Sequence, residues 1–243
     1  MKTYCLEVTG DFACFTRPEM KVERVSYDVM TPSAARAVFE SILWKPAIHW
    51  HITKIEVLKP IKWISVRRNE VAAVAIIGKD GIFADEPSVR QQRAGLFLRD
   101  VAYRIHAHFE LRDSGFHKSN YPYLSKRKVN QNEDDLAVLP DNNAPKFMSM
   151  FERRARKGQC VNQPYLGCRE FAANFRLVEN SATIQSPAIV ETRDLGWMLY
   201  DLDYGKSGDH PQPLFFNARL RNGELTGKEV DHLPAWDSGE VRG

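Results

Sequence analysis

Cysteine is scarce in this sequence, and the other features that would place the chain in a special class are missing as well. The four cysteines among 243 residues show no Cys-x-x-Cys pair and no Cys/His spacing, which excludes a disulfide framework and a zinc site. No apolar run approaches the roughly 20 residues of a membrane helix, and no signal-peptide pattern opens the sequence. We therefore expect a cytoplasmic protein that contacts no membrane and needs no metal or other cofactor.

Charge of one sign is also not in large excess, because the net charge is only +3. Hydrophobic residues make up 43% of the chain and aromatic residues 11%, enough for a sizeable core. The basic residues are nevertheless clustered, at residues 126–128, at residues 153–157, and at Arg90 with Arg93. Local clustering of this kind indicates contacts with the phosphates of a nucleic acid more strongly than overall charge does.

The segment from Ala144 to Gly158 predicts a short amphipathic helix. Pro145 suits a first helical turn and Gly158 a C-cap. At 100° per residue, one face collects the apolar residues Phe147, Met150, Phe151 and Ala155. On a flank of that face, Lys146, Arg153 and Lys157 fall within about 40° of one another. We expect this basic stripe to hold a phosphate backbone.

The remaining pattern predicts an α+β fold. A second helix begins at Thr31, the N-cap, with Pro32 at its first position. Strands are expected at residues 3–15, 50–58, 61–66, 71–77, 96–111, 169–178, 196–204, 214–221 and 224–230. This order predicts a ferredoxin-like (RRM-like) domain with an inserted β-hairpin over residues 1–180, and a small C-terminal antiparallel β-sheet over residues 181–243. The polar stretch 116–143 is expected to be a long connection.

The strand expected at residues 96–111 has one apolar and one polar face. Alternate residues from Val101 to Leu111 predict the core face. The opposite face carries Arg104, His106 and His108, and histidine is the commonest general base near neutral pH. The alternative is that these histidines only satisfy polar neighbours across the sheet.

Several motifs, in order along most of the chain, resemble a known family. These are Gly10–Thr16, Ser26-Tyr27, Thr31–Ala35, Glu40–Ile42, Trp44–Pro46, Arg90–Arg93, Arg153-Arg154, Gly158–Cys160, Pro164–Gly167, Arg169–Phe171, Asp201–Tyr204 and Phe215-Phe216. Together they resemble the Dvulg-subtype (type I-C) CRISPR-associated protein of the fifth Cas family, a member of the RAMP superfamily.

The resemblance implies a function and a set of partners. It implies a metal-independent endoribonuclease that cuts precursor CRISPR RNA at the repeat hairpin. It also implies that the protein then stays on the mature 5′ handle and assembles with the other type I-C Cascade subunits. The family's cleavage residues are a Tyr before the Trp-Lys-Pro motif and a Lys-His pair at the start of the second helix. Here these positions are Leu43, Lys146 and Phe147.

Metal-free RNA cleavage needs a base for the 2′-hydroxyl, a cation for the charge on phosphorus and an acid for the leaving oxygen. Lys146 is the candidate cation, and His108 or, more weakly, Tyr27 is the candidate base. Further RNA contacts are expected from Arg90, Arg93, Arg153 and Lys157, with Trp44 stacking on a base and Lys45 beside it.

Three alternatives remain open on the sequence alone. Since the Tyr and His positions are Leu43 and Phe147, the chain could bind the RNA handle with little or no cutting. Asp201 and Asp203 share one strand face and could hold Mg²⁺ in a metal-dependent nuclease, although a structural or subunit-contact role is favoured because no third ligand is evident. Duplex DNA, bound without sequence specificity, is a further candidate partner.

Overall fold

The computed structural model describes residues 2–72, 74, 81–83, 85, 87–111, 143–179, 186–203 and 212–226. Its elements, in chain order, are β1 (Tyr4–Ala13), the 3-10 helix η1 (Pro18–Met20), α1 (Pro32–Ile42), β2 (Ile48–Val57), β3 (Trp63–Val71), β4 (Arg90–Leu111), α3 (Ala144–Arg156), β5 (Asn174–Leu177), β6 (Arg193–Asp203), β7 (Gln212–Leu220) and β8 (Glu224–Thr226). The expected connection at 116–142 and most of the strand expected at 71–77 lie outside the described residues.

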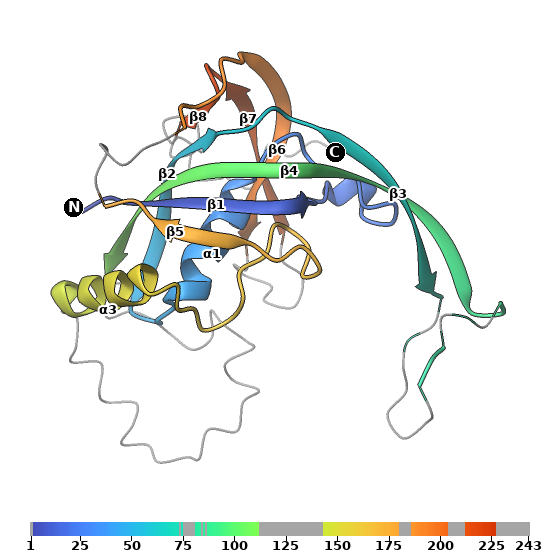
Figure 1. Ribbon diagram of the computed structural model, residues 1–243, viewed down its shortest axis with the longest axis horizontal. Coiled ribbons are helices and arrows are strands. Elements are labelled where there is room, and N and C mark those ends of the chain that lie inside the picture. Colours follow the sequence, from blue (N-terminus) through green and yellow to red (C-terminus); the bar gives the residue numbers. More distant parts are fainter. Residues whose placement is uncertain are drawn as a thin grey trace.

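A mostly antiparallel sheet forms the centre of the fold, with strand order β5-β1-β4-β2-β8. The long strand β4 pairs with different strands along its two halves. Its second half lies between β1 and β2, while its first half pairs with β3 from Arg90↔Val71 to Leu98↔Trp63. The β3–β4 hairpin therefore extends away from the body of the molecule (Figure 1).

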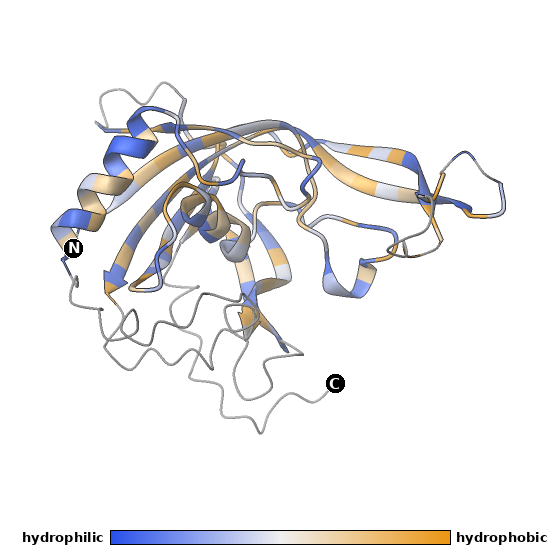
Figure 2. Cartoon of the chain, turned by 90° about the horizontal axis from the view of Figure 1, so that it is seen from below, coloured by the Kyte–Doolittle hydropathy of each residue, from blue (hydrophilic) through white to orange (hydrophobic). Residues whose placement is uncertain are grey.

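The two helices, α1 and α3, pack on one face of this sheet. Phe39 of α1 stacks on Phe151 of α3, and Trp50 of β2 contacts both rings. The predicted core face of β4 is confirmed, because alternate residues from Val101 to Phe109 are buried. Figure 2 shows the same alternation as changing colour along the strands. Burial of so many large side chains is the main source of stability.

The start of α1 follows the sequence prediction. Thr31 is extended, its hydroxyl accepts a hydrogen bond from the Ala34 backbone N–H at 3.3 Å, and Pro32 occupies the first turn. The N-cap satisfies a backbone donor that the helix itself leaves without a partner.

The C-terminal strands differ from the expected single small sheet. β6 and β7 pair with each other, but β8 joins the main sheet beside β2. A tight turn at Asn222-Gly223, where both residues have positive φ, redirects the chain from β7 into β8. The predicted division at residue 180 stays a prediction. No helix in the described part of the chain has the length and apolar character needed to cross a membrane.

Candidate functional site

Helix α3 carries one buried apolar face and one exposed basic face. Its buried residues are Phe147, Phe151 and Ala155. The exposed basic residues, which we call the α3 stripe, are Lys146, Arg153 and Lys157. The sequence prediction of this helix and of its two faces is confirmed.

The first turn of α3 adds to the positive potential near Lys146. The Asn143 side chain caps the helix by accepting from the Lys146 backbone N–H at 3.4 Å, and Pro145 lies in the first turn. The helix dipole gives this end a partial positive charge, which favours an anion. At the other end Gly158 has φ +63°, a left-handed conformation that suits glycine and ends the helix.

Arg154 and Arg156, the other basic residues in the last turns of α3, form contacts within the chain. Arg154 donates to the carbonyl oxygen of Ile42 at 2.8 Å, which joins α3 to the end of α1. Arg156 pairs with Glu152 at 3.1 Å and with Glu179 at 2.5 Å. In contrast, the described residues include no ion-pair partner for Arg153 or Lys157. These two side chains are available to an external anion.

The residues at the family's Tyr and His positions belong to the core. Leu43 is fully buried, and Phe147 is buried with its ring 6.5 Å from that of Phe109. Neither side chain can carry a proton in catalysis. Trp44 and Lys45, both half-buried, follow directly after Leu43. The Arg154–Ile42 hydrogen bond places this segment next to α3.

The predicted base His108 lies in a cluster that the sequence did not reveal. The His51 ring stacks on the His108 ring at 5.3 Å, and the His49 ring contacts His51 at 4.6 Å. The Glu110 carboxylate lies close to two of these rings. Nε2 of His51 is 3.4 Å from one oxygen, and Nε2 of His108 is 3.6 Å from the other. We call these four residues the histidine cluster.

The signal for the cluster was the spacing of His49 and His51 around Trp50. Because β2 alternates, burying Trp50 turns both histidines to the opposite face, where the register aligns His51 with His108. The sequence could not give that register.

His108 and Lys146 lie on different sides of the sheet. Phe109 faces the helix layer and contacts Phe147, so its neighbour His108 points to the other face. Both residues are nevertheless near one end of the sheet, since β4 ends at Leu111 beside α3 (Figures 1 and 2).

Tyr27, the weaker candidate base, is in the core and is 1% exposed. Burial raises the pKa of its phenol, and the charge of Glu19 adds to this, although Arg17 opposes it with its guanidinium 4.6 Å over the ring. The phenol is therefore harder to ionise than an exposed one.

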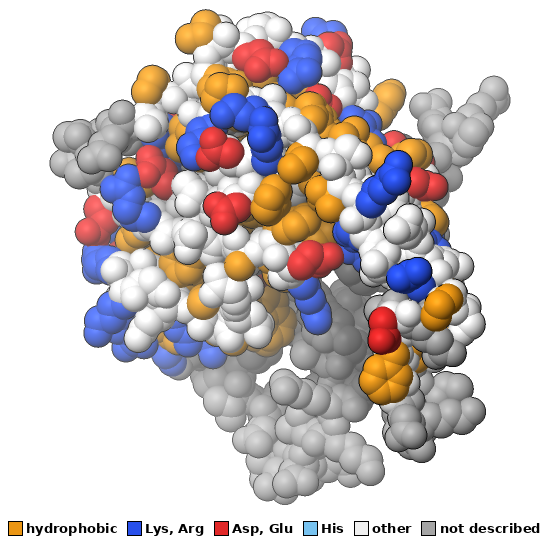
Figure 3. All heavy atoms as spheres, turned by 45° about the vertical axis from the view of Figure 1, so that its right-hand side comes forward, with side chains coloured by type: hydrophobic (Ala, Val, Ile, Leu, Met, Phe, Trp, Pro, Cys, Tyr) orange, Lys and Arg blue, Asp and Glu red, His pale blue; other side chains and the backbone are white. Residues whose placement is uncertain are grey.

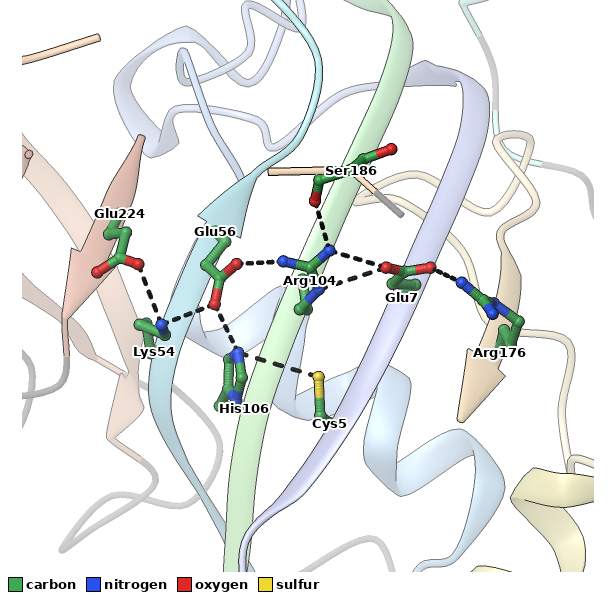
Figure 4. A network of polar contacts seen from close by, with 9 residues as sticks. All are labelled: Cys5, Glu7, Lys54, Glu56, Arg104, His106, Arg176, Ser186 and Glu224. Carbon is green, nitrogen blue, oxygen red and sulfur yellow. Dashed lines mark hydrogen bonds and ion pairs between the residues drawn. The ribbon is translucent and has the colours of Figure 1, made fainter. Parts of the chain in front are cut away.

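A network of ion pairs covers the open face of the sheet next to the histidine cluster (Figure 4). Arg104, expected on a polar face, is 2% exposed and bonds Glu7, Glu56 and the carbonyl oxygen of Ser186. Burial alone would raise the pKa of Glu56. Hydrogen bonds from His106, Lys54 and Arg104 instead lower this pKa to about 2. His106 is thus held by Glu56 at 2.8 Å and has a structural role.

The Asp201 carboxylate is likewise held by an arginine. Both of its carboxylate oxygens accept from Nη2 of Arg36 at 2.7 Å, and Arg36 also binds Glu40 at 2.7 Å. Among the described residues, no group of three acidic, His or Cys side chains is placed to bind a metal ion. Asp201 therefore has the structural role that the sequence favoured, and the Asp203 side chain lies outside the described residues.

Arg90 and Arg93 lie on the β3–β4 hairpin, at the opposite end of the long axis from α3 (Figures 1 and 2). Arg90 is exposed, whereas Arg93 is half-buried and donates to Gln91 at 2.8 Å. The surface seen in Figure 3 carries basic and acidic side chains interspersed, not one large patch of a single sign. The predicted RNA-binding residues thus form two separate groups.

Comparison with known proteins gives two close sequence relatives. A CRISPR pre-crRNA endoribonuclease Cas5d of Mannheimia succiniciproducens is 47% identical over 233 residues, covering 90% of this chain and 92% of the relative. A protein of the same name from Thermus thermophilus is 36% identical over 256 residues, covering 98% of this chain and 97% of the relative.

Solved structures agree with this at the level of the fold. A crystal structure of a CRISPR-associated protein superposes with a TM-score of 0.63 at 23% identity, over 95% of this chain and 94% of that chain. A functionally uncharacterized protein of Streptococcus mutans gives 0.61 at 21% identity over the same shares. The family model described as CRISPR-associated protein (Cas_Cas5) matches residues 3–227. The chain therefore belongs to the Cas5 family of CRISPR-associated proteins.

Proposed function

We propose that this protein is a metal-independent endoribonuclease that cuts precursor CRISPR RNA at the repeat hairpin. It then stays on the mature 5′ handle as a subunit of the type I-C Cascade. The observation that carries the proposal is the exposed α3 stripe, found in a chain that is 47% identical to a protein named as a pre-crRNA endoribonuclease. Its four free thiols suit the reducing cytoplasm.

In the proposed reaction the base removes the proton of the 2′-hydroxyl, and its oxygen bonds to the phosphorus of its own 3′ phosphate. The P–O5′ bond breaks and the leaving oxygen takes a proton from solvent, which gives a 5′-hydroxyl end and a 2′,3′-cyclic phosphate. Lys146, at the positive end of the α3 dipole, stabilises the extra negative charge on phosphorus. Arg153 and Lys157 hold neighbouring phosphates, with Trp44 and Lys45 contacting the RNA beside them.

His108 is the proposed base, in preference to the buried Tyr27. Glu110 can orient the imidazole and stabilise its protonated form, in the way that carboxylates support catalytic histidines. His51 shares Glu110 and stacks on His108, so a second proton-transfer group lies next to the first. The 2′-hydroxyl and its own 3′ phosphate are adjacent in the RNA, whereas His108 and Lys146 face opposite sides of the sheet, so one phosphodiester must lie at the very end of β4 to contact both.

A second candidate function is RNA-handle binding without cutting. The observation that favours it is the burial of Leu43 and Phe147 at two of the family's three catalytic positions. In this case the α3 stripe would still hold the handle.

One assay separates the two functions. Purified protein is incubated with a labelled repeat hairpin in excess EDTA, and the ends of the products are identified. Cutting at one site with a cyclic-phosphate end supports the endoribonuclease. Tight binding without cutting supports the binding subunit, and cutting only after Mg²⁺ is added would contradict metal independence.

The fold proposed for this RNA-binding body is ferredoxin-like. The order β1-α1-β2-β4-α3-β5, with β1 and β4 in the centre of the sheet, supports this proposal, and β3 would then be part of the inserted hairpin. We further propose that residues 181–243 form an extension of this body. We also propose that the remaining surface contacts other Cascade subunits and duplex DNA.

A further inference from the structure

A charged cavity of about 690 Å³ lies beside the end of β3, in the half of the β3–β4 hairpin that is farther from the main sheet. Its lining comes from three segments that are distant in the sequence. These are the loop before α1, the end of β3 and the loop before β5, which contribute Arg24, Arg68, Asn69, Glu70, Val71 and Glu170. The cavity is large enough for one nucleotide and is remote from α3.

The guanidinium of Arg68 has two donors without acceptors. Nη1 lies 3.0 Å from Oε1 of Glu70, and the group stands 5.1 Å over the ring of Phe97. Nε and Nη2 are buried and have no hydrogen-bond partner. These two nitrogens form one edge of the guanidinium, which binds two acceptors lying in its plane. Buried donors without partners are costly, so it would be favourable for the Arg68 side chain to turn this edge into the cavity toward the acceptors of a ligand.

The Glu70 carboxylate, in turn, has an oxygen that lacks a hydrogen-bond donor. Its Oε1 lies within 3.0 Å of Arg68 and 3.4 Å of Arg24, yet this buried oxygen makes no hydrogen bond. The site therefore needs a ligand that presents a donor close to two acceptors.

Arg24 adds an independent sign of function. It adopts φ +55°, a conformation that is strained for a residue with a side chain. Its carbonyl oxygen accepts from the Leu96 N–H at 3.3 Å, and its guanidinium binds Glu170 at 2.7 Å. The surrounding structure thus holds Arg24 against the cavity. Such strained residues concentrate at ligand sites.

The charges of the lining decide between a base and a phosphate. The lining has two arginines and two glutamates, and Arg93, outside the lining, has its Nε 3.7 Å from Oε2 of Glu70. The two carboxylates would repel a phosphate. Guanine is uncharged and offers O6 and N7 as two coplanar acceptors, with N1–H beside them as a donor. We propose that this cavity binds one guanine base of the RNA. The Arg68 edge would take O6 and N7, and Glu70 would accept from N1–H. This inference rests on the proposed function as an RNA-binding protein.

The test uses the whole protein and four fluorescein-labelled hexanucleotides. One is hexauridylate, and the others carry a single guanine, adenine or cytosine at the third position. Anisotropy should show at least tenfold tighter binding of the guanine oligonucleotide than of the other three, in line with the discrimination of a good bidentate contact. Equal binding of all four would overturn the proposal, as would a preference for cytosine, which also presents two acceptors and a donor.

Two variants of Arg68 and one variant of its neighbour Arg67 distinguish recognition of the guanine base from attraction of RNA by positive charge. Arg68→Lys keeps the charge beside Glu70 but removes the two-nitrogen edge, so the preference for guanine should fall below twofold, as in Arg68→Ala. Arg67→Ala is the matched control, because Arg67 is exposed on the other face of β3 and should keep the full preference. An Arg68→Lys protein that melts like wild type and still prefers guanine tenfold would refute the assignment.

A parallel cleavage assay on the repeat hairpin keeps the two proposals apart. If the protein binds the hexanucleotides without base preference but cuts the hairpin in EDTA, the guanine site is wrong and the proposed function stands. If it binds no RNA at all, the proposed function fails first.

Discussion

Lys146 and Phe147 are neighbours in the first turn of α3 but have opposite surroundings. Phe147 is buried against Phe109, whereas Lys146 is exposed at the N-terminal end of the helix. Lys146→Ala should lower the single-turnover cleavage rate about 100-fold or more, because the charge on phosphorus loses its cation. RNA affinity should fall by less than about tenfold.

The control for this prediction is Lys146→Arg, which keeps the charge and should retain part of the activity. Both variants are assayed by single-turnover cleavage at saturating protein, with affinity measured separately by filter binding. Unchanged cleavage by Lys146→Ala would remove Lys146 from the site.

Arg153 and Arg156 provide a matched pair on the same helix. Arg153 has no ion-pair partner among the described residues, while Arg156 is engaged by Glu152 and Glu179. Arg153→Ala should weaken RNA binding and reduce the slope of log affinity against log salt by about one phosphate contact. Arg156→Ala should leave that slope unchanged. The measurement is a salt titration from about 50 to 200 mM, and equal slopes for both variants would contradict the α3 stripe.

At the residue scale, the sequence predicted exposure better than it predicted partners. The α3 stripe could be derived because a helix has a fixed angular repeat. The pairing of His51 with His108 could not, because it depends on the β2–β4 register, which is not a property of local sequence.

The strands of the main sheet are tied together on the open face by the network around Arg104 and Glu56 (Figure 4). Glu56 has a folded-state pKa of about 2, below its ordinary 4.5. Its ionised form therefore adds stability that is complete above about pH 4.5 and is lost as the pH falls toward 2. Glu56→Gln should cost about 3 kcal/mol of unfolding free energy at pH 7.

The pH profile provides the test of this network. Urea unfolding between pH 7 and pH 3 should show a smaller loss of stability for Glu56→Gln than for wild type, because the variant has no such carboxylate to protonate. Glu23→Gln, at an exposed position, should follow the wild-type curve. Parallel acid dependence in all three proteins would show that Glu56 does not contribute as described.

At the scale of elements, local signals placed both helices and most strands. The N-cap at Thr31, the proline at Pro145 and the glycine at Gly158 act within one turn, and the structure follows them. β8 was expected in the tail sheet with β7, yet it pairs with β2. An Asn-Gly turn predicts only a reversal of the chain. Which edge the next strand joins depends on the open side of β2, which is a tertiary property.

For the whole molecule, the main consequence is the separation of two candidate RNA contacts along the longest axis. The α3 stripe lies at one end and the β3–β4 hairpin, with Arg90 and the Arg68 cavity, at the other (Figure 1). One compact RNA element cannot occupy both. A hairpin with a single-stranded handle is a ligand of suitable extent, since the folded part and the handle can be held at different places.

This arrangement predicts how two distant substitutions combine. Arg153→Ala and Arg90→Ala should each weaken binding of an RNA that carries both the repeat hairpin and its handle. Because the two sites are far apart and share no partner, their free-energy costs should add to within about 0.5 kcal/mol in the double variant. A stem-loop without the handle should respond to only one of the two substitutions. Binding of each RNA by the four proteins can be measured at one fixed salt concentration. If the double variant has the same affinity for the long RNA as the single variant that binds it less tightly, one RNA does not contact both the α3 stripe and the β3–β4 hairpin.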